Sequence, residues 1–186
     1  MAQIKKGMAI LYKDEPHLVL DFKHTHKGRG GATITVKLKN IVSGNVITAT
    51  FKADEDVEEV PVDRHEAVYS YRMGDTFVFF DNQTYEEVHF SESDIEHALG
   101  YLKEGMEVKI LYADNKPITI ELPTFVEMEV VETEPNFKGD TASGGTKPAK
   151  IETGKVIKVP FFIETGDIIK IDTRDDRYIE RVGKKK

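Results

Sequence analysis

The sequence predicts an all-β protein made of three small β-barrels in tandem. Apolar and polar residues alternate with a period of two in short segments that are bounded by turn residues, a pattern typical of half-buried strands. About five such segments recur in each group of roughly 60 residues, a number that suits a small barrel. The three groups span residues 1–64, 65–125 and 126–186.

The first group contains a predicted hairpin. In Ala32–Lys39 four apolar residues alternate with threonines and lysines, which indicates one buried and one exposed face. In the preceding segment we expect Leu18, Leu20 and Phe22 to share the buried face. The four strands expected in this group are Met8–Tyr12, Leu18–Lys23, Ala32–Lys39 and Val46–Phe51. The acidic stretch Ala53–Glu59 after them is expected to be an exposed loop.

The second and third groups are expected to form OB-type barrels. The strands expected there are Ala67–Tyr71, Phe77–Asp81, Glu86–Phe90, Glu107–Tyr112, Ile118–Leu122, Val126–Thr133, Val156–Ile163, Asp167–Asp172 and Tyr178–Val182. Ser93 and Glu96 have the spacing of a capping box, and the apolar residues that follow predict one short helix over a barrel end. Residues 134–150 are expected to form a long glycine-rich connection, and a compact domain seldom keeps such a loop without a use for it.

The net charge of −7 is distributed unevenly along the chain. Residues 1–52 contain nine Lys and Arg against three Asp and Glu, whereas residues 53–125 contain five against 18. A basic first third followed by an acidic middle indicates a molecule with one end suited to a polyanion.

Several kinds of chemistry find no support in the sequence. The absence of cysteine excludes disulfides, zinc–thiolate sites and thiol catalysis. The six histidines show no metal-binding pattern, and no catalytic motif is present, so we expect neither a catalytic residue nor a metal ligand. The start of the chain has no apolar signal core and no run is long enough to span a membrane, so we expect a cytoplasmic protein without a membrane partner.

The connection between the first two long strands carries Lys27 and Arg29 among Gly28, Gly30 and Gly31. One interpretation is a solvated hairpin end, because glycine supplies the positive φ that turns need. The other is a cationic finger whose thin backbone approaches a crowded surface. The spacing does not fit a P-loop or a dinucleotide fingerprint.

Several separate stretches carry a resemblance to a known family. Val131-Glu-Thr-Glu-Pro-Asn-Phe-Lys-Gly-Asp-Thr-Ala-Ser-Gly is the most specific of them. Val159-Pro-Phe-Phe-Ile, Ile171-Asp-Thr-Arg and Val36-Lys-Leu-Lys-Asn-Ile-Val-Ser-Gly agree with it in order and spacing. Over essentially its whole length the chain resembles the bacterial elongation factor P family.

The resemblance implies an SH3/KOW-like barrel followed by two OB-fold barrels in an elongated, tRNA-like outline. It implies a monomeric, non-enzymatic translation factor without a cofactor that binds both ribosomal subunits and relieves stalling at consecutive prolines. The tip residues Lys27, Gly28, Arg29 and Gly30 would approach the P-site peptidyl-tRNA. Gly139, Asp140 and Thr141 would approach the E-site codon of the mRNA, and Tyr178 and Arg181 would face RNA.

The tip departs from the commonest pattern of the family. Many members carry Pro-Gly-Lys-Gly with a modified lysine, whereas this chain has Lys27 at the proline position and Arg29 at the lysine position. A minority of the family attaches a rhamnose to a tip arginine. The resemblance therefore leaves three alternatives: Arg29 modified by a glycosyltransferase, an unmodified arginine, or a divergent paralogue.

Two other function classes remain at this point. One is a tandem OB-type module that binds RNA without a role in peptidyl transfer, in which aromatic side chains would stack on bases. Most of the aromatic residues lie in the acidic middle third, where RNA would be repelled. The other is an enzyme with an unrecognised site, which turnover of a metabolite would reveal.

Overall fold

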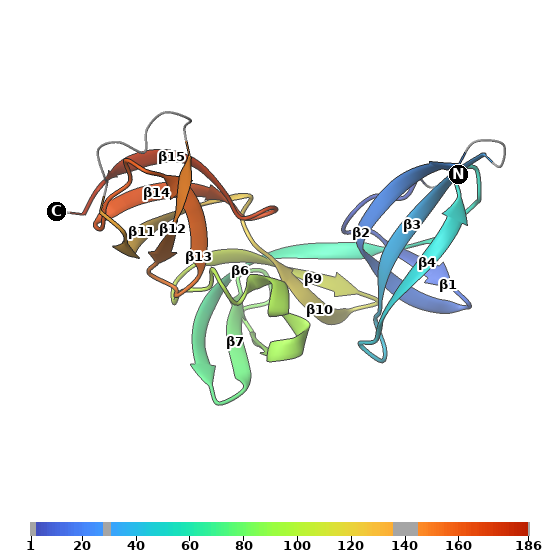
Figure 1. Ribbon diagram of the computed structural model, residues 1–186. Helices are drawn as coiled ribbons and strands as arrows, with labels where there is room; N and C mark the ends of the chain where they lie inside the picture. The colour runs from blue at the N-terminus through green and yellow to red at the C-terminus, as the bar shows by residue number, and fades with distance from the viewer. Residues whose placement is uncertain (1–2, 28–30, 136–144, 186) are drawn as a thin grey trace. The chain divides into compact units, whose positions relative to one another are not determined.

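The computed structural model describes residues 3–27, 31–135 and 145–185. Within them the backbone forms three five-stranded sheets, each curled into a small barrel (Figure 1). Their strands are β1 (Ala9–Tyr12), β2 (Glu15–Lys27), β3 (Gly31–Asn40), β4 (Val46–Lys52), β5 (Glu59–Val60), β6 (Val62–Met73), β7 (Thr76–Asp81), β8 (Glu87–Ser91), β9 (Glu107–Ala113), β10 (Lys116–Glu121), β11 (Phe125–Thr133), β12 (Thr146–Ile151), β13 (Val156–Pro160), β14 (Asp167–Asp172) and β15 (Arg177–Lys184). The predicted all-β class is confirmed.

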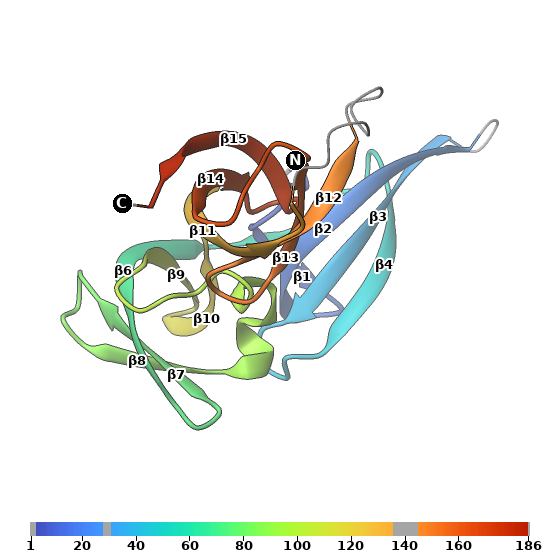
Figure 2. The same cartoon turned by 60° about the vertical axis from the view of Figure 1, so that its left-hand side comes forward.

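The first sheet has the order β4-β3-β2-β1-β5. Its long strands β2 and β3 pair side by side from His17 and Asn40 to Lys27 and Gly31 (Figure 2). The buried apolar side chains of β3 are Ile34, Val36 and Leu38, and they alternate with more exposed residues as far as Lys37, as the sequence predicts. At the end of the strand Lys39 and Asn40 are buried as well. The short strand β5 pairs with β1 and begins at Glu59, at the end of the acidic stretch that was expected to be only a loop.

Strand β2 does not keep one buried face, and this part of the prediction is wrong. The pairing with β3 shifts between Val19 and Asp21, so Leu20 is an extra residue in a β-bulge. Because side chains alternate along a strand, one extra residue reverses which side chains beyond the bulge point to each face of the sheet. Val19 and Phe22 consequently pack in the barrel core, whereas Leu18 and Leu20 pack in a second cluster on the other side of the sheet.

That second cluster includes residues from far along the chain. Leu111, Ala113 and Ile118, from the β9–β10 hairpin, are buried against Leu18 together with Leu20, Ile41 and Val62. The chain accordingly separates into two compact units, of which the first combines Met1–His65 with Ile110–Thr119. The second contains Glu66–Lys109 and Ile120–Lys186.

The second sheet has the order β10-β9-β6-β7-β8 and an aromatic core. The ring of Phe79 lies 5.2 Å from that of Tyr69 and 5.6 Å from that of Phe90, measured between centroids. The predicted helix is replaced by two 3-10 turns, Glu92–Asp94 and Glu96–Ala98. The capping box is formed by Ser91 and Asp94, two residues earlier than predicted. Ile95 between the turns has φ −126°, outside the helical range, and its side chain is fully buried.

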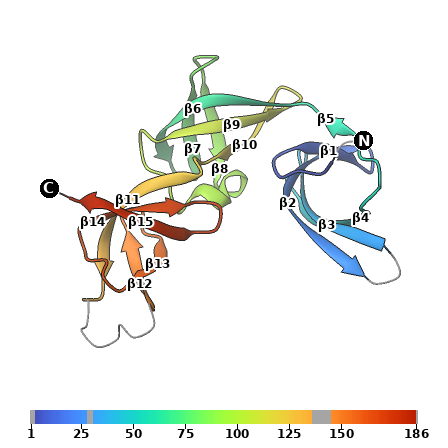
Figure 3. The same cartoon turned by 90° about the horizontal axis from the view of Figure 1, so that it is seen from above.

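The strands of the third sheet lie together in Figure 3, in the order β13-β12-β11-β14-β15. Read from β15, this is the same succession of strands as in the second sheet read from β10. Strand β12 lies inside the segment that was expected to be a connection. Its side chains alternate between exposed and buried, but one buried position is Lys147 and one exposed position is Pro148. A lysine on the inner face and a proline within the strand conceal the strand pattern in the sequence.

No helix in the described part of the chain is long and apolar enough to cross a membrane.

Candidate functional site

The β2–β3 hairpin holds the predicted tip. The strands pair from His17 and Asn40 to Lys27 and Gly31, so only residues 28–30 connect the two paired ends. Gly31 has φ +81°, a backbone conformation that favours glycine at the start of β3. Of the predicted tip residues the structure describes the backbone of Lys27, whereas Gly28, Arg29 and Gly30 lie outside the described residues.

The part of the hairpin below the tip is held mainly by cross-strand packing. The rings of Phe22 and His24 meet edge to face with centroids 5.5 Å apart, next to the buried Ile34 and Val36 of β3. On the other face the Thr33 hydroxyl donates to the Thr25 carbonyl oxygen over 3.4 Å. The hairpin is therefore an arm with one packed and one polar face, and β4 pairs with β3 as far as Thr33.

Gly139, Asp140 and Thr141 also lie outside the described residues, but the structure describes both ends of their connection. β11 ends at Thr133, whose hydroxyl donates to the Pro148 carbonyl oxygen over 2.9 Å. The Lys147 side chain is only 3% exposed, and its ammonium group donates to the Glu134 carbonyl oxygen. These two bonds tie β12 to the end of β11, which fixes where the connection starts and ends.

Phe161 packs closely beside the same connection. A Cβ atom added to Gly145 would lie 2.7 Å from Cε2 of the Phe161 ring. This contact is closer than real Cβ atoms tolerate, so Gly145 permits the ring to cover the start of the strand.

Tyr178 and Arg181 lie on the same strand, β15, in different surroundings. The half-buried Tyr178 packs against the core of the third barrel, and this burial is the main cause that raises the pKa of its hydroxyl. Arg181 is exposed, with its guanidinium carbon 6.0 Å from the centroid of the Phe162 ring. Of the two, Arg181 is the more accessible to a partner.

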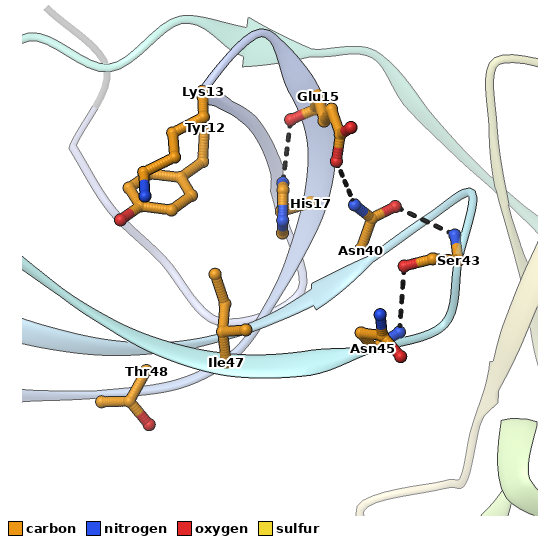
Figure 4. A pocket seen from close by; sticks show the side chains of 9 residues that line it. All are labelled: Tyr12, Lys13, Glu15, His17, Asn40, Ser43, Asn45, Ile47 and Thr48. Carbon is orange, nitrogen blue, oxygen red and sulfur yellow. Dashed lines mark hydrogen bonds between the residues drawn. The ribbon is translucent and has the colours of Figure 1, made fainter.

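A hollow of about 350 Å³ in the first barrel received no prediction from the sequence (Figure 4). It is lined by Tyr12, Lys13, Glu15, His17, Asn40, Ser43, Asn45, Ile47 and Thr48. Asn40 donates to the Glu15 carboxylate and accepts from the amides of Val42 and Ser43 at 2.8 and 3.0 Å. These bonds hold the β3–β4 turn in place, which accounts for the polar residues there.

Among the described residues no group of three or more His, Asp or Glu side chains is placed to hold a metal ion.

Comparison with known proteins gives three consecutive matches along the chain. The family description "Elongation factor P (EF-P) KOW-like domain" matches residues 1–57, "Elongation factor P (EF-P) OB domain" matches 62–120, and "Elongation factor P, C-terminal" matches 126–181. The chain belongs to the elongation factor P family. It is a translation elongation factor, and the KOW-like and OB barrels predicted from the sequence are confirmed.

Individual members of the elongation factor P family match over nearly their whole length. The chain is 49% identical over 175 residues to elongation factor P of Dictyoglomus thermophilum, which covers 94% of this chain and 95% of that protein. It is also 49% identical over 180 residues to elongation factor P of Aquifex aeolicus, covering 97% and 94% respectively. The family resemblance derived from separate sequence stretches is thereby confirmed.

Proposed function

We propose that this elongation factor binds the ribosome beside the P-site peptidyl-tRNA and accelerates peptide-bond formation at consecutive prolines. The observation that carries the proposal is the uninterrupted match of all three domains, in order, to the elongation factor P family. The factor acts as a monomer in the cytoplasm, where it meets the ribosome, the tRNA and the mRNA.

The hairpin supplies a physical route for this activity. Two paired strands bring Lys27 and Gly31 to the end of the arm, and Arg29 lies between them in the chain. A guanidinium is permanently charged and offers planar donors that suit phosphate and base edges. Contacts of this kind hold the tRNA end near attack geometry, and positioning alone lowers the entropic part of the barrier. In this mechanism no side chain of the factor makes or breaks a bond.

The third barrel supplies a second contact in the proposal. Gly139, Asp140 and Thr141 approach the E-site codon, while Arg181 and the neighbouring Tyr178 face RNA of the small subunit. Support comes from the tied ends of the connection and from the exposed position of Arg181.

The proposal is tested by reconstituted translation of a message with consecutive prolines. We expect faster diprolyl synthesis when the purified factor is added and little change on a matched message without prolines. The proposal would be contradicted if neither the factor purified from its native host nor the unmodified factor stimulated diprolyl synthesis. RNA binding without stimulation would favour a tandem OB-type RNA-binding module instead.

The contribution of the third barrel is tested by Asp140→Ala. We expect weaker stimulation with a change in the free energy of unfolding of about 0.5 kcal/mol or less, as is usual for an exposed loop. Glu132→Ala, which removes one exposed charge from β11, is the matched control. A large loss of thermal stability with normal stimulation would instead identify Asp140 as a residue that holds the turn.

A further inference from the structure

The hollow in the first barrel lies at the end of β2 that is opposite the tip. Its lining comes from the β1–β2 turn, the start of β2, the end of β3 and the start of β4, whereas the tip joins the other end of β2 at Lys27. Ligand sites often occur in the mouths of β-barrels, and a volume of about 350 Å³ is within the usual range of such sites. The hollow is therefore a candidate site that is separate from the tip.

An apolar side chain on the core face of β4 is open to this hollow. Ile47, Ala49 and Phe51 point to the same face, because side chains alternate along a strand. Ala49 and Phe51 pack in the barrel core and are only 5% and 7% exposed, whereas Ile47 is 38% exposed. Leu38, directly opposite Ile47 on β3, is fully buried. The core therefore ends at the hollow in an accessible apolar wall.

The hollow also contains a buried hydrogen-bond acceptor. His17 is only 4% exposed, and its ring meets that of Tyr12 edge to face with centroids 5.6 Å apart. Nδ1 of His17 lies 2.8 Å from the Glu15 carbonyl oxygen. A carbonyl oxygen only accepts, so Nδ1 carries the hydrogen and Nε2 of the neutral ring is an acceptor.

This acceptor is not used within the protein. Nε2 is turned away from Glu15 into the hollow (Figure 4), and it has no hydrogen-bond partner among the residues that the structure describes. Buried polar groups nearly always have a partner, so the position of Nε2 indicates that a ligand supplies the donor.

Support of the two turns accounts for only part of the lining. The Asn40 side chain holds the β3–β4 turn, and Nδ1 of His17 bonds beside the β1–β2 turn. Neither role requires an acceptor at Nε2 or an open apolar wall at Ile47. These two features are therefore the ones that a ligand would use.

The charges at the rim favour an uncharged part of a ligand over a phosphate. Nζ of Lys13 lies 5.5 Å from the centroid of the Tyr12 ring. Asp14 and Glu15 follow Lys13 in the chain, and both are exposed. One cation beside two carboxylates does not make a phosphate site. The hollow instead suits a flat, uncharged group with an N–H donor at its edge.

We propose that the hollow binds one unstacked nucleobase of RNA. The proposal goes beyond the tip and E-site contacts of the proposed function and does not depend on them. Every base is flat and presents an N–H donor at its edge, which Nε2 of His17 accepts. Tyr12 and Ile47 supply the aromatic and apolar surfaces against which an unstacked base packs. The basic excess of residues 1–52 makes this barrel the part of the translation factor that RNA approaches most readily.

The test measures binding of the full chain to two single-stranded RNA pentamers. One carries all its bases, and the other has the same sugar–phosphate backbone without bases. Fluorescence anisotropy of labelled pentamers gives the two affinities, and nitrogen NMR follows Nε2 of His17 during the titration.

Two variants alter the hollow in independent ways. His17→Phe keeps a ring in place and removes the acceptor, whereas Ile47→Trp fills the hollow and leaves the Nδ1 bond of His17 intact. Val46→Trp is the matched control, because Val46 is exposed on the opposite face of β4. Thermal melts show whether each variant is folded, and Ile47→Trp keeps the test decisive if His17→Phe is not.

We expect wild type and Val46→Trp to bind the intact pentamer at least about tenfold more tightly than the pentamer without bases, because packing and one hydrogen bond both favour a base. His17→Phe should lose about fivefold of this preference, and Ile47→Trp should lose all of it. The Nε2 signal of His17 should shift with the intact pentamer and stay in place with the other.

Other outcomes overturn the proposal. Equal affinities of wild type for the two pentamers would show that only sugar and phosphate are bound. A preference that both hollow variants keep would place the base at another surface. Adenosine that binds as tightly as the pentamer would assign the hollow to free nucleosides, and a preference for N-acetyltryptophanamide would assign it to a protein side chain. Diprolyl stimulation is measured separately, so failure of the proposed function is not confused with any of these results.

Discussion

Arg29 is the residue on which the proposed activity depends most. Its neighbours in the chain, Gly28 and Gly30, have no side chains against which it could pack, so the core does not account for its identity. Lysine would keep the charge but would lose the planar set of donors, and it offers no guanidinium nitrogen to a glycosyltransferase.

We predict that Arg29→Ala removes most of the stimulation of diprolyl synthesis and that Arg29→Lys does not restore it. Lys6→Ala, which removes one exposed charge from the same barrel, should have little effect. If Arg29 is rhamnosylated, intact-mass measurement of protein from the native host will show one added sugar at this residue. Full rescue of proline-stalled translation by Arg29→Ala would exclude the tip from the mechanism.

Asp172 is a residue whose charge contributes to the stability of the third barrel. Its buried carboxylate accepts from the Arg174 amide at 2.9 Å and from Nε and Nη2 of that side chain at 3.1 and 2.7 Å. These bonds lower the pKa of Asp172 to about 2. Because this value is below the pKa of about 3.9 for an unfolded aspartate, the charge stabilises the folded state above about pH 4. That contribution is lost as the pH falls toward 2.

We therefore predict that Asp172→Asn lowers stability at pH 7 and flattens the fall in stability between about pH 4 and about pH 2. Asp175→Asn is the control, because Asp175 is exposed and only pairs with Arg177 at 3.6 Å. Urea unfolding at a series of pH values measures both effects. Parallel curves for wild type and Asp172→Asn across this window would contradict the assignment.

At the scale of elements, most strands could be predicted because their period-two pattern is strong. β12 could not, since Lys147 takes an inner position where an apolar residue is expected and Pro148 interrupts the run. The bulge at Leu20 could not either, because Leu18, Leu20 and Phe22 alternate perfectly in the sequence. Only the three-dimensional contact with the β9–β10 hairpin explains why both faces of β2 need apolar residues.

The candidate site could be predicted from the sequence only in part. The sequence locates the hairpin and its basic tip, and pairing of Lys27 with Gly31 places the three connecting residues at its end. Alternation in Ala32–Lys39 also indicates an exposed face of Thr and Lys. It does not show that β2 and β4 align further lysines with that face, because cross-strand register is a property of the folded sheet.

Within the second unit, Tyr101 joins the segment after the 3-10 turns to the third barrel. Its side chain belongs to the core of that barrel, and its hydroxyl donates to Asp176 over 2.5 Å. Lys155 lies 3.4 Å from the same carboxylate and 5.2 Å from the centroid of the Tyr101 ring. Burial is the main cause that raises the pKa of the Tyr101 hydroxyl, followed by the bond to Asp176.

We predict that Tyr101→Phe lowers the free energy of unfolding of the second unit by about 1 kcal/mol, the usual value of one hydrogen bond. The ring and its packing remain, so the loss reports on the bond to Asp176. Tyr85→Phe, at a tyrosine that is 76% exposed, should leave the stability unchanged. Equal denaturant midpoints for the two variants would show that the bond contributes nothing.

At the scale of the whole molecule, three barrels in sequence do not correspond to three independent bodies. The first compact unit includes the end of the β9–β10 hairpin, although the second family match covers that hairpin. Apolar burial drives this sharing, because Leu18, Leu111 and Ala113 are each at most 3% exposed. Without the hairpin, part of the outer surface of the first barrel would be an exposed apolar patch.

We predict that Leu111→Ala loosens the first barrel, although residue 111 lies far from it in the sequence. Truncation of a buried leucine costs about 2–5 kcal/mol, and the lost contacts here are with β2. The amide of Val19, which donates to the Met8 carbonyl oxygen over 2.8 Å, should consequently exchange its hydrogen faster. Ile157→Ala in the core of the third barrel should leave that amide protected, since Ile157 belongs to the second unit. If Leu111→Ala and wild type protect the Val19 amide equally, the hairpin and the first barrel do not unfold together.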